Sequence, residues 1–214
     1  KAAKNPRAHE IITAGRSFHG RTLAAITATG QSKYHKGFEP MVPGFRYAEF
    51  NNLESFAELI TEETCAVLVE PVQGEGGVYP AHAEFLQGLR RLCDDNNLLL
   101  IFDEVQCGMG RTGKLFAYEH FDVTPDVFTL AKALAGGLPV GVTAARGTAA
   151  ETLVPGDHAS TFGGNPVVCA AASIALDLFT EDGFLSQVTA LGEYFAQKLR
   201  ELPSAHIKEI RGMG

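Results

Sequence analysis

The sequence has no cluster of lysine and arginine, and its formal net charge is −7 over 214 residues. A chain with this balance is repelled by phosphate backbones and anionic membrane surfaces, so neither nucleic acid nor a membrane is expected as a partner. It also lacks an apolar run of the ~18 residues that a membrane-spanning helix needs. Its first residues carry no apolar signal-peptide core. The hydrophobic share of 45% and the charged share of 20% indicate an ordinary globular domain.

Cysteine and histidine are few and scattered. The cysteines are Cys65, Cys93, Cys107 and Cys169; none forms a C-x-x-C pair, and three lie in apolar surroundings. Buried free thiols are therefore expected rather than disulfides. The seven histidines show no H-E-x-x-H spacing, so no metal site is expected. Free thiols without a signal peptide indicate a cytoplasmic protein.

Short, continuous apolar runs predict buried strands of a covered sheet. The four runs are His9–Ala14, Cys65–Glu70, Leu98–Phe102 and Asp126–Ala131. Helical spacing over Glu84–Asp95 separates the second run from the third, and Asn51 and Asn52 are candidate caps for a shorter helix that ends near Ile60. This alternation predicts a mainly parallel α/β sheet.

A fifth apolar run, Val140–Ala145, follows the fourth too closely for a parallel crossover. If it pairs with the fourth strand, it must run antiparallel, so a mixed sheet is expected. Beyond it, Asn165 and Pro166 predict a helix start, with a helix to about Phe179. A second amphipathic helix is expected over Leu185–Leu202, and Ile207–Ile210 is a candidate first strand of another domain.

These patterns divide the chain into a large domain, residues 1–160, and a segment, residues 161–214, with an interdomain helix and the start of a smaller C-terminal domain. The sequence begins without methionine and stops at Gly214 in what resembles the middle of an element. A fragment of a longer protein is therefore expected.

Polar residues stand at or just beyond several strand ends: Glu70, Asp103 and Lys132. Alone, each has an ordinary explanation, since an aspartate there is usually a turn residue and a lysine is usually solvated. Together they favour a function, because ligands of open α/β sheets gather beyond the carboxyl ends of the strands. A lysine and an aspartate so placed can hold opposite poles of pyridoxal phosphate, the lysine at the aldehyde carbon and the aspartate at the ring nitrogen.

Five segments, in order along nearly the whole chain, carry a family resemblance. They are Ser17–Thr22 (SFHGRT), Glu70–Gly77 (EPVQGEGG), Phe102–Gly113 (FDEVQCGMGRTG), Thr129–Gly137 (TLAKALAGG) and Ser160–Pro166 (STFGGNP). This set resembles the class III (ω-)aminotransferases. The resemblance implies an enzyme with bound pyridoxal phosphate, the type I fold of such transferases, and a homodimer with active sites between the subunits.

The resemblance assigns the catalytic pair. Lys132 resembles the lysine that binds the cofactor aldehyde and later moves a proton between substrate and cofactor carbons. Its amine must be neutral to attack, which a buried, cationic neighbourhood would favour. Asp103 resembles the carboxylate that keeps the pyridine nitrogen protonated. Gln106 resembles the residue that contacts the phenolic oxygen, and Phe18 the aromatic that stacks on the ring.

The remaining assignments concern the substrates and the second subunit. Arg21 resembles the arginine that binds a substrate carboxylate. Glu75 resembles the glutamate that helps the site switch between an amino-group-bearing substrate and a dicarboxylate, whereas Glu70 resembles a structural residue. Thr161 resembles the hydroxyl that reaches the phosphate of the neighbouring subunit's cofactor.

Within the family, the resemblance is strongest to the branch that moves the terminal amino group of N-acetylornithine to 2-oxoglutarate, yielding glutamate, in arginine biosynthesis. His19 favours this branch, because ornithine aminotransferases commonly have tryptophan there. Succinylornithine, succinyl-diaminopimelate, ornithine and 4-aminobutyrate remain alternative amino donors.

Two other functions stay open. The resemblance implies that the family's phosphate cradle would lie upstream of Lys1, with Lys1–Asn5 resembling the tail of its helix, and that a substrate-binding arginine would lie beyond Gly214. The isolated segment is therefore also a candidate non-catalytic dimerising module. Gly108, Gly110 and Gly113 have G-x-G-x-x-G spacing after a strand, but the next residues resemble a loop rather than a nucleotide-binding helix.

Overall fold

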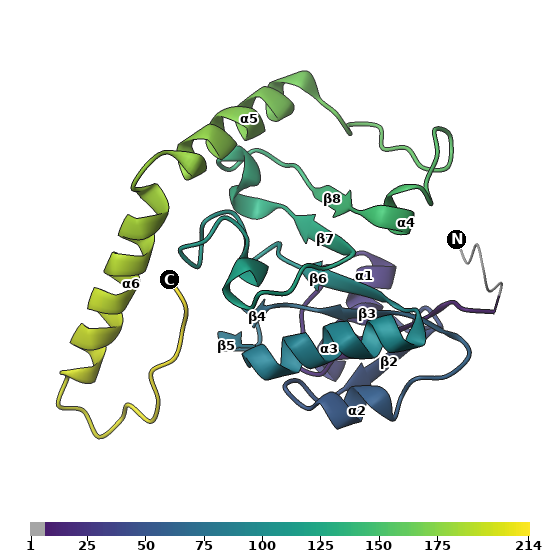
Figure 1. Ribbon diagram of the computed structural model, residues 1–214, viewed down its shortest axis with the longest axis horizontal. Helices are drawn as coiled ribbons and strands as arrows, with labels where there is room; N and C mark the ends of the chain where they lie inside the picture. The colour runs from purple at the N-terminus through teal and green to yellow at the C-terminus, as the bar shows by residue number, and fades with distance from the viewer. Residues whose placement is uncertain (1–6) are drawn as a thin grey trace.

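Six strands form the central sheet, in the order β2-β1-β3-β6-β7-β8. The computed structural model describes residues 7–214, so the helix tail expected over Lys1–Asn5 lies outside them. The strands are β1 (Glu10–Ala14), β2 (Phe45–Ala48), β3 (Thr64–Val69), β6 (Leu99–Asp103), β7 (Val127–Leu130) and β8 (Val142–Ala145). All neighbours are parallel except β7 and β8. The prediction of a mixed, mainly parallel α/β sheet is confirmed (Figure 1).

The main core lies between one face of the sheet and helix α3 (Ala83–Asn96). Phe85, Leu86 and Leu89 of α3 are buried against alternate residues of the strands, such as Val67 and Leu100. The short helix α2 (Leu53–Ala57) adds Phe56 to the same core. Successive strand residues point to opposite faces, so the residues in between, Leu68 among them, face the other side, where α1 (Leu23–Ala28) covers part of the sheet.

Two asparagines that the sequence predicted as helix caps accept hydrogen bonds from backbone N–H groups of the first helical turn. The Asn52 side chain accepts from Ser55 N at 3.3 Å, and α2 ends at Ala57 rather than near Ile60. The Asn165 side chain accepts from Val167 N at 3.0 Å and begins α5 (Pro166–Thr180). The helix expected over Glu84–Asp95 is contained within α3. The helix expected over Leu185–Leu202 is α6 (Phe184–Arg200).

The strand expected at Ile207–Ile210 is wrong, because this segment has no strand conformation. The chain instead folds back over the small hairpin of β4 (Val72–Gln73) and β5 (Tyr79–Pro80). There the Arg211 guanidinium lies 3.9 Å from the centre of the Tyr79 ring and donates to Gly77 O at 2.9 Å. Met213 packs against the core. Side-chain packing therefore holds this segment without a ladder of strand bonds.

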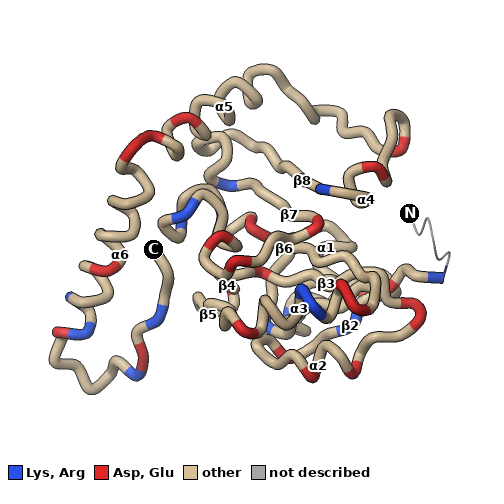
Figure 2. Tube along the Cα trace, in the orientation of Figure 1, with Lys and Arg blue, Asp and Glu red and all other residues tan. Residues whose placement is uncertain are grey.

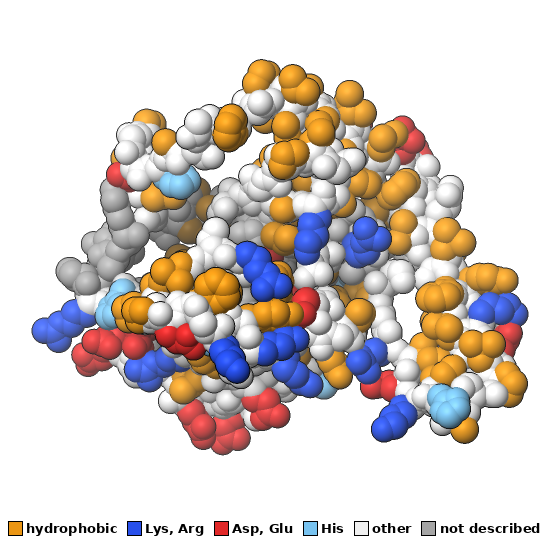
Figure 3. Space-filling view, turned by 180° about the vertical axis from the view of Figure 1, so that it is seen from behind, with side chains coloured by type: hydrophobic (Ala, Val, Ile, Leu, Met, Phe, Trp, Pro, Cys, Tyr) orange, Lys and Arg blue, Asp and Glu red, His pale blue; other side chains and the backbone are white. Residues whose placement is uncertain are grey.

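Helix α5 crosses the top of the view in Figure 1, above β8, and α6 runs down its left side. They keep many large apolar side chains on the surface, which Figure 3 shows along the top and at the right. These include Val167, Ile174, Leu178, Leu191, Tyr194 and Phe195. Helix α5 contacts the 3₁₀ helix η3 (Lys132–Ala135). In residues 7–214, no helix is both long and apolar enough to cross a bilayer.

Charged and sulfur-containing side chains are dispersed. Lysine and arginine are scattered along the trace among acidic residues (Figure 2). All four cysteines are free thiols. Cys93 and Cys107 are buried and Cys65 is half-buried, whereas Cys169 is exposed. The expectation of burial therefore holds for two thiols and partly for the third.

Candidate active site

The three polar residues that follow strands lie together at the carboxyl ends of neighbouring strands. Glu70 directly follows β3, Asp103 is the last residue of β6, and Lys132 follows β7 as the first residue of η3. Because these strands are parallel neighbours, their carboxyl ends share an edge. The register pairs Asp103 with Thr129, three residues before Lys132.

Asp103 is 8% exposed, and its carboxylate is held from three sides. Oδ1 accepts from Thr129 Oγ1 at 3.0 Å and from Val105 N at 3.1 Å, and Oδ2 lies 2.8 Å from His19 Nδ1. A carboxylate has about four acceptor positions. One position on this group is therefore left for a ligand, and its orientation is already fixed.

Lys132 has a left-handed backbone, with φ of 47°, which is unusual for a residue with a side chain. Partial burial lowers the pKa of its amine, while the charges of Asp103 and Glu70 oppose that shift. The buried, cationic neighbourhood expected from the sequence is thus not observed, since Lys132 is exposed and its charged neighbours are acidic. Desolvation alone favours the neutral amine here.

Glu70 is 2% exposed and connects two loops. Its Oε2 accepts from Phe18 N at 3.0 Å, and its Oε1 accepts from Gly74 N at 3.4 Å. Burial raises the pKa of Glu70 to about 7, although nearby His19 and the two amide donors lower it. These bonds agree with the structural role expected for Glu70, because they place Phe18 and the loop that bears Glu75.

Phe18, Arg21 and Glu75 form a cluster around Tyr34, a residue that the sequence patterns did not single out. The rings of Phe18 and Tyr34 meet edge to face, with centres 5.6 Å apart. The Arg21 guanidinium lies over both rings, at 5.2 Å from Phe18 and 4.5 Å from Tyr34. Glu75 accepts hydrogen bonds from the Tyr34 hydroxyl and from Gln31 Nε2, the latter at 2.6 Å. The Tyr34 bond, followed by the Gln31 bond, lowers the pKa of Glu75.

Gln106 packs against Gly74, so closely that a Cβ on that glycine would lie 2.7 Å from Gln106 Oε1. Glu104, which sequence reasoning also missed, fixes the loop that carries Gln106. It is 1% exposed and accepts from Ala117 N at 2.7 Å and from Tyr118 N at 2.8 Å. Burial raises its pKa to about 7. Its position next to Asp103 was the one available signal.

Thr161 lies apart from this cluster. It is exposed in the segment before α5. Among residues 7–214, it forms no hydrogen bond with the other candidate residues. The predicted role of Thr161 in a second subunit's site stays a prediction.

A pocket of about 420 Å³ opens beside Asp103, on the face of the sheet that α1 partly covers. Its lining includes His19, Val105, Thr129 and Ala131. Its volume lies in the range of about 300–1,000 Å³ that is typical of small-molecule pockets, but Lys132, Phe18 and Gln106 do not line it. His19 Nε2 is buried nearby and has no hydrogen-bond partner among the described residues.

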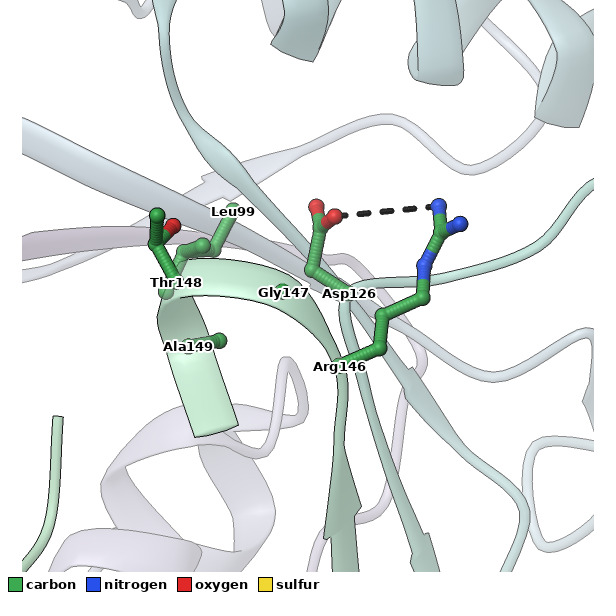
Figure 4. A pocket seen from close by; sticks show the side chains of 6 residues that line it. All are labelled: Leu99, Asp126, Arg146, Gly147, Thr148 and Ala149. Carbon is green, nitrogen blue, oxygen red and sulfur yellow. Dashed lines mark ion pairs between the residues drawn. The ribbon is translucent and has the colours of Figure 1, made fainter. Parts of the chain in front are cut away.

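A second pocket, of about 310 Å³, lies at the amino ends of β6 and β7 (Figure 4). Asp126 and Arg146 line it, with Arg146 Nη2 and Asp126 Oδ1 3.8 Å apart. Asp126 also accepts from Arg90 at 2.8 Å and from Leu100 N at 2.8 Å. Its charge is thus used within the fold, and this pocket is not a candidate site. Across residues 7–214, no group of three or more His, Cys, Asp or Glu side chains is arranged to hold a metal ion.

Comparisons with known proteins give a consistent pattern. The sequence profile of the family described as "Aminotransferase class-III" matches residues 1–214. The chain is 53% identical to an acetylornithine aminotransferase of Caldanaerobacter subterraneus subsp. tengcongensis, with 96% of this chain and 53% of that protein covered. It is 49% identical to a succinylornithine transaminase of Yersinia pseudotuberculosis, with 100% and 52% covered.

A solved structure has the same fold. The ornithine aminotransferase from Toxoplasma gondii ME49 superposes with a TM-score of 0.93 at 36% identity, covering 98% of this chain and 51% of that one. Another structure of the Toxoplasma gondii enzyme is described with partial occupancy of PLP at its active site. The chain spans about half the length of the relatives that it matches.

Proposed function

Because the chain belongs to the class III aminotransferases, we propose that the whole protein is a pyridoxal-phosphate-dependent transaminase. We further propose that it transfers the terminal amino group of N-acetylornithine to 2-oxoglutarate. The family membership inferred from the five motifs is thereby confirmed, whereas the activity and substrates are our proposal.

The observation that carries this proposal is the convergence of one amine and one oriented carboxylate at adjacent strand ends. Asp103 and Lys132 follow neighbouring parallel strands, and the charge of Asp103 acts on the Lys132 amine. The carboxylate keeps an unused acceptor position beside a pocket of suitable volume. In the proposed site, the amine would bind at the aldehyde and the carboxylate at the ring nitrogen of the cofactor.

These residues fit pyridoxal phosphate. When bound, the group supplies an aldehyde that carries the amino group and a ring that withdraws electrons from the substrate carbon. Asp103 would hold a proton at the ring nitrogen, since an ionised acceptor favours the protonated form of its partner. Phe18 would supply an aromatic face to the ring. Gln106 would contact the phenolic oxygen.

Lys132 would move a proton at the substrate carbon. Its lowered pKa increases the share of neutral amine, which is the form that accepts a proton. Arg21 would hold a substrate carboxylate through its planar guanidinium. Thr161 would reach the phosphate of the second subunit's cofactor, which makes a homodimer part of the proposal.

The acyl group of the donor has two candidates. The relatives at 53% and 50% identity are named acetylornithine aminotransferases, and one at 49% is named a succinylornithine transaminase. This narrow difference supports N-succinylornithine as the second candidate. Equal concentrations of the two compounds, with ornithine and 4-aminobutyrate as comparisons, should separate the donors by kcat/KM.

The test of the chemistry uses the full-length protein. Borohydride reduction in the presence of pyridoxal phosphate should add the cofactor mass to the peptide containing Lys132. Lys132→Ala should lose both this label and transamination, while Lys114→Ala, at another exposed lysine, should keep both. Retained transamination in Lys132→Ala would refute the assignment, and a full-length protein that takes up no cofactor would favour the non-catalytic module.

A further inference from the structure

We propose that Tyr34 is a positioning residue that keeps Arg21 and Glu75 apart, so that both charges remain available to substrates. This inference rests on the proposed function, which requires the site to accept both an amino donor and a dicarboxylate acceptor. Nothing in the motifs or the comparisons assigns a role to Tyr34.

The geometry places Tyr34 between the two charged groups. It is the last residue of the 3₁₀ helix η1 (Ser32–Tyr34) and is half-buried. The Arg21 guanidinium lies 4.5 Å from the centre of its ring, and its hydroxyl donates to Glu75 Oε1. One side chain therefore contacts the cation through its face and the anion through its edge.

Arg21 and Glu75 both contact Tyr34. The charge of Arg21 contributes to the lowered pKa of Glu75, behind the larger effects of Tyr34 and Gln31. A guanidinium and a carboxylate that meet directly form two parallel hydrogen bonds, which neutral donors do not match. Without a spacer, these two groups would form that pair and satisfy each other instead of a ligand.

The donors that hold Glu75 in place are neutral. The Tyr34 hydroxyl and the Gln31 amide orient the carboxylate without cancelling its charge. Lys33 Nζ, at 3.8 Å, is 63% exposed and adds little, because solvent screens such pairs. The guanidinium lies near the faces of both rings, and the N–H donors of its planar group can bind a substrate carboxylate.

The decisive variant is Tyr34→Phe, which keeps the ring under Arg21 and removes the hydroxyl that holds Glu75. In the full-length holoenzyme, we expect the dissociation constant of glutarate, a dicarboxylate that cannot react, to rise about 5- to 10-fold by calorimetry. The KM for 2-oxoglutarate should rise by a similar factor, with kcat within about 2-fold. Tyr194→Phe, at an exposed tyrosine on α6, is the matched control and should change neither value.

The same substitution made in the Glu75→Gln variant distinguishes a positioning role of Tyr34 from a general structural role. In Glu75→Gln there is no carboxylate to pair with Arg21, so adding Tyr34→Phe should leave glutarate affinity unchanged within about 2-fold. An equal loss in both backgrounds would overturn the proposal, and so would no loss in either. A wild type that binds no glutarate would also overturn it.

The experiments distinguish a failure of the proposed function from a failure of the proposed role of Tyr34. If the wild type binds glutarate but transaminates no donor, the proposed function fails, and the glutarate cycle still decides the role of Tyr34. If transamination proceeds and the cycle is additive, the proposed function stands and Tyr34 has no positioning role.

Discussion

Replacement of Glu104 by glutamine should destabilise the protein by an amount that depends on pH. The carboxyl is 1% exposed and accepts from Ala117 N and Tyr118 N at 2.7 and 2.8 Å. Glutamine has one acceptor oxygen, so its NH₂ group must face at least one of these N–H donors. An unsatisfied buried donor costs about 1–3 kcal/mol. That cost should appear in full at acidic pH, where the glutamate is protonated.

At higher pH the wild type is itself destabilised, because the buried Glu104 carboxyl becomes ionised. Burial raises the pKa of Glu104 from 4.5 to about 7. The protonated carboxyl therefore contributes its full share of the free energy of unfolding below the pKa of Glu104 in the unfolded chain. This contribution is lost as the pH rises through the pKa of Glu104 in the folded protein. A shift of this size corresponds to about 3 kcal/mol in all, of which about 2–3 kcal/mol is lost between about pH 5 and pH 8. Glutamine does not ionise, so the difference between variant and wild type should shrink by that amount.

The assay is urea unfolding of wild type and Glu104→Gln at several values between about pH 5 and pH 8. Glu58→Gln, at an exposed residue that does not contribute to the pKa of Glu104, is the control and should show a small, pH-independent effect. Glu70, whose pKa is also raised to about 7, leaves a remaining slope in both proteins. A destabilisation by Glu104→Gln that does not vary with pH would refute the reasoning.

Three further outcomes can be checked. Thr161→Val should weaken cofactor retention about 10-fold in the full-length protein while leaving its dimer intact in sedimentation, because one hydrogen bond to phosphate is removed; unchanged retention would contradict the second-subunit role. Gly30→Ala should cost about 3 kcal/mol or more in urea unfolding, since a Cβ there would lie 2.2 Å from Ala14 O; a near-neutral effect would be inconsistent with this backbone contact. Asp126→Ala should cost about 3 kcal/mol, because Arg90 loses the less exposed of its two carboxylate partners; a loss below about 1 kcal/mol would show that Asp94 alone suffices.

The sequence predicted every strand of the six-stranded sheet except β2. Runs such as Leu98–Phe102 are recognisable because both faces of a central strand are at least partly covered. Strand β2 was missed, since it is short, lies at the sheet edge and has only Ala48 buried. The candidate strand at Ile207–Ile210 failed for the opposite reason. Its apolar residues matched a strand, but within residues 7–214 no partner strand lies beside it.

The sequence predicted those site residues whose side-chain chemistry and position after a strand indicate a role without knowledge of their neighbours. Asp103 and Lys132 were placed at one edge from strand order alone. Tyr34 and Glu104 were missed because their roles depend on contacts with residues distant in the sequence, such as the bond from Tyr34 to Glu75. No local pattern distinguishes them from an ordinary surface tyrosine and an ordinary turn glutamate.

The left-handed backbone at Lys132 has a consequence for how this protein evolves. With φ of 47°, any side chain there is strained by roughly 1 kcal/mol relative to glycine. Glycine would relieve this strain but would remove the amine that the proposed function requires, so selection for stability and selection for the proposed activity would act in opposite directions on one codon. Purely thermal screens of variants should enrich the loss of this lysine.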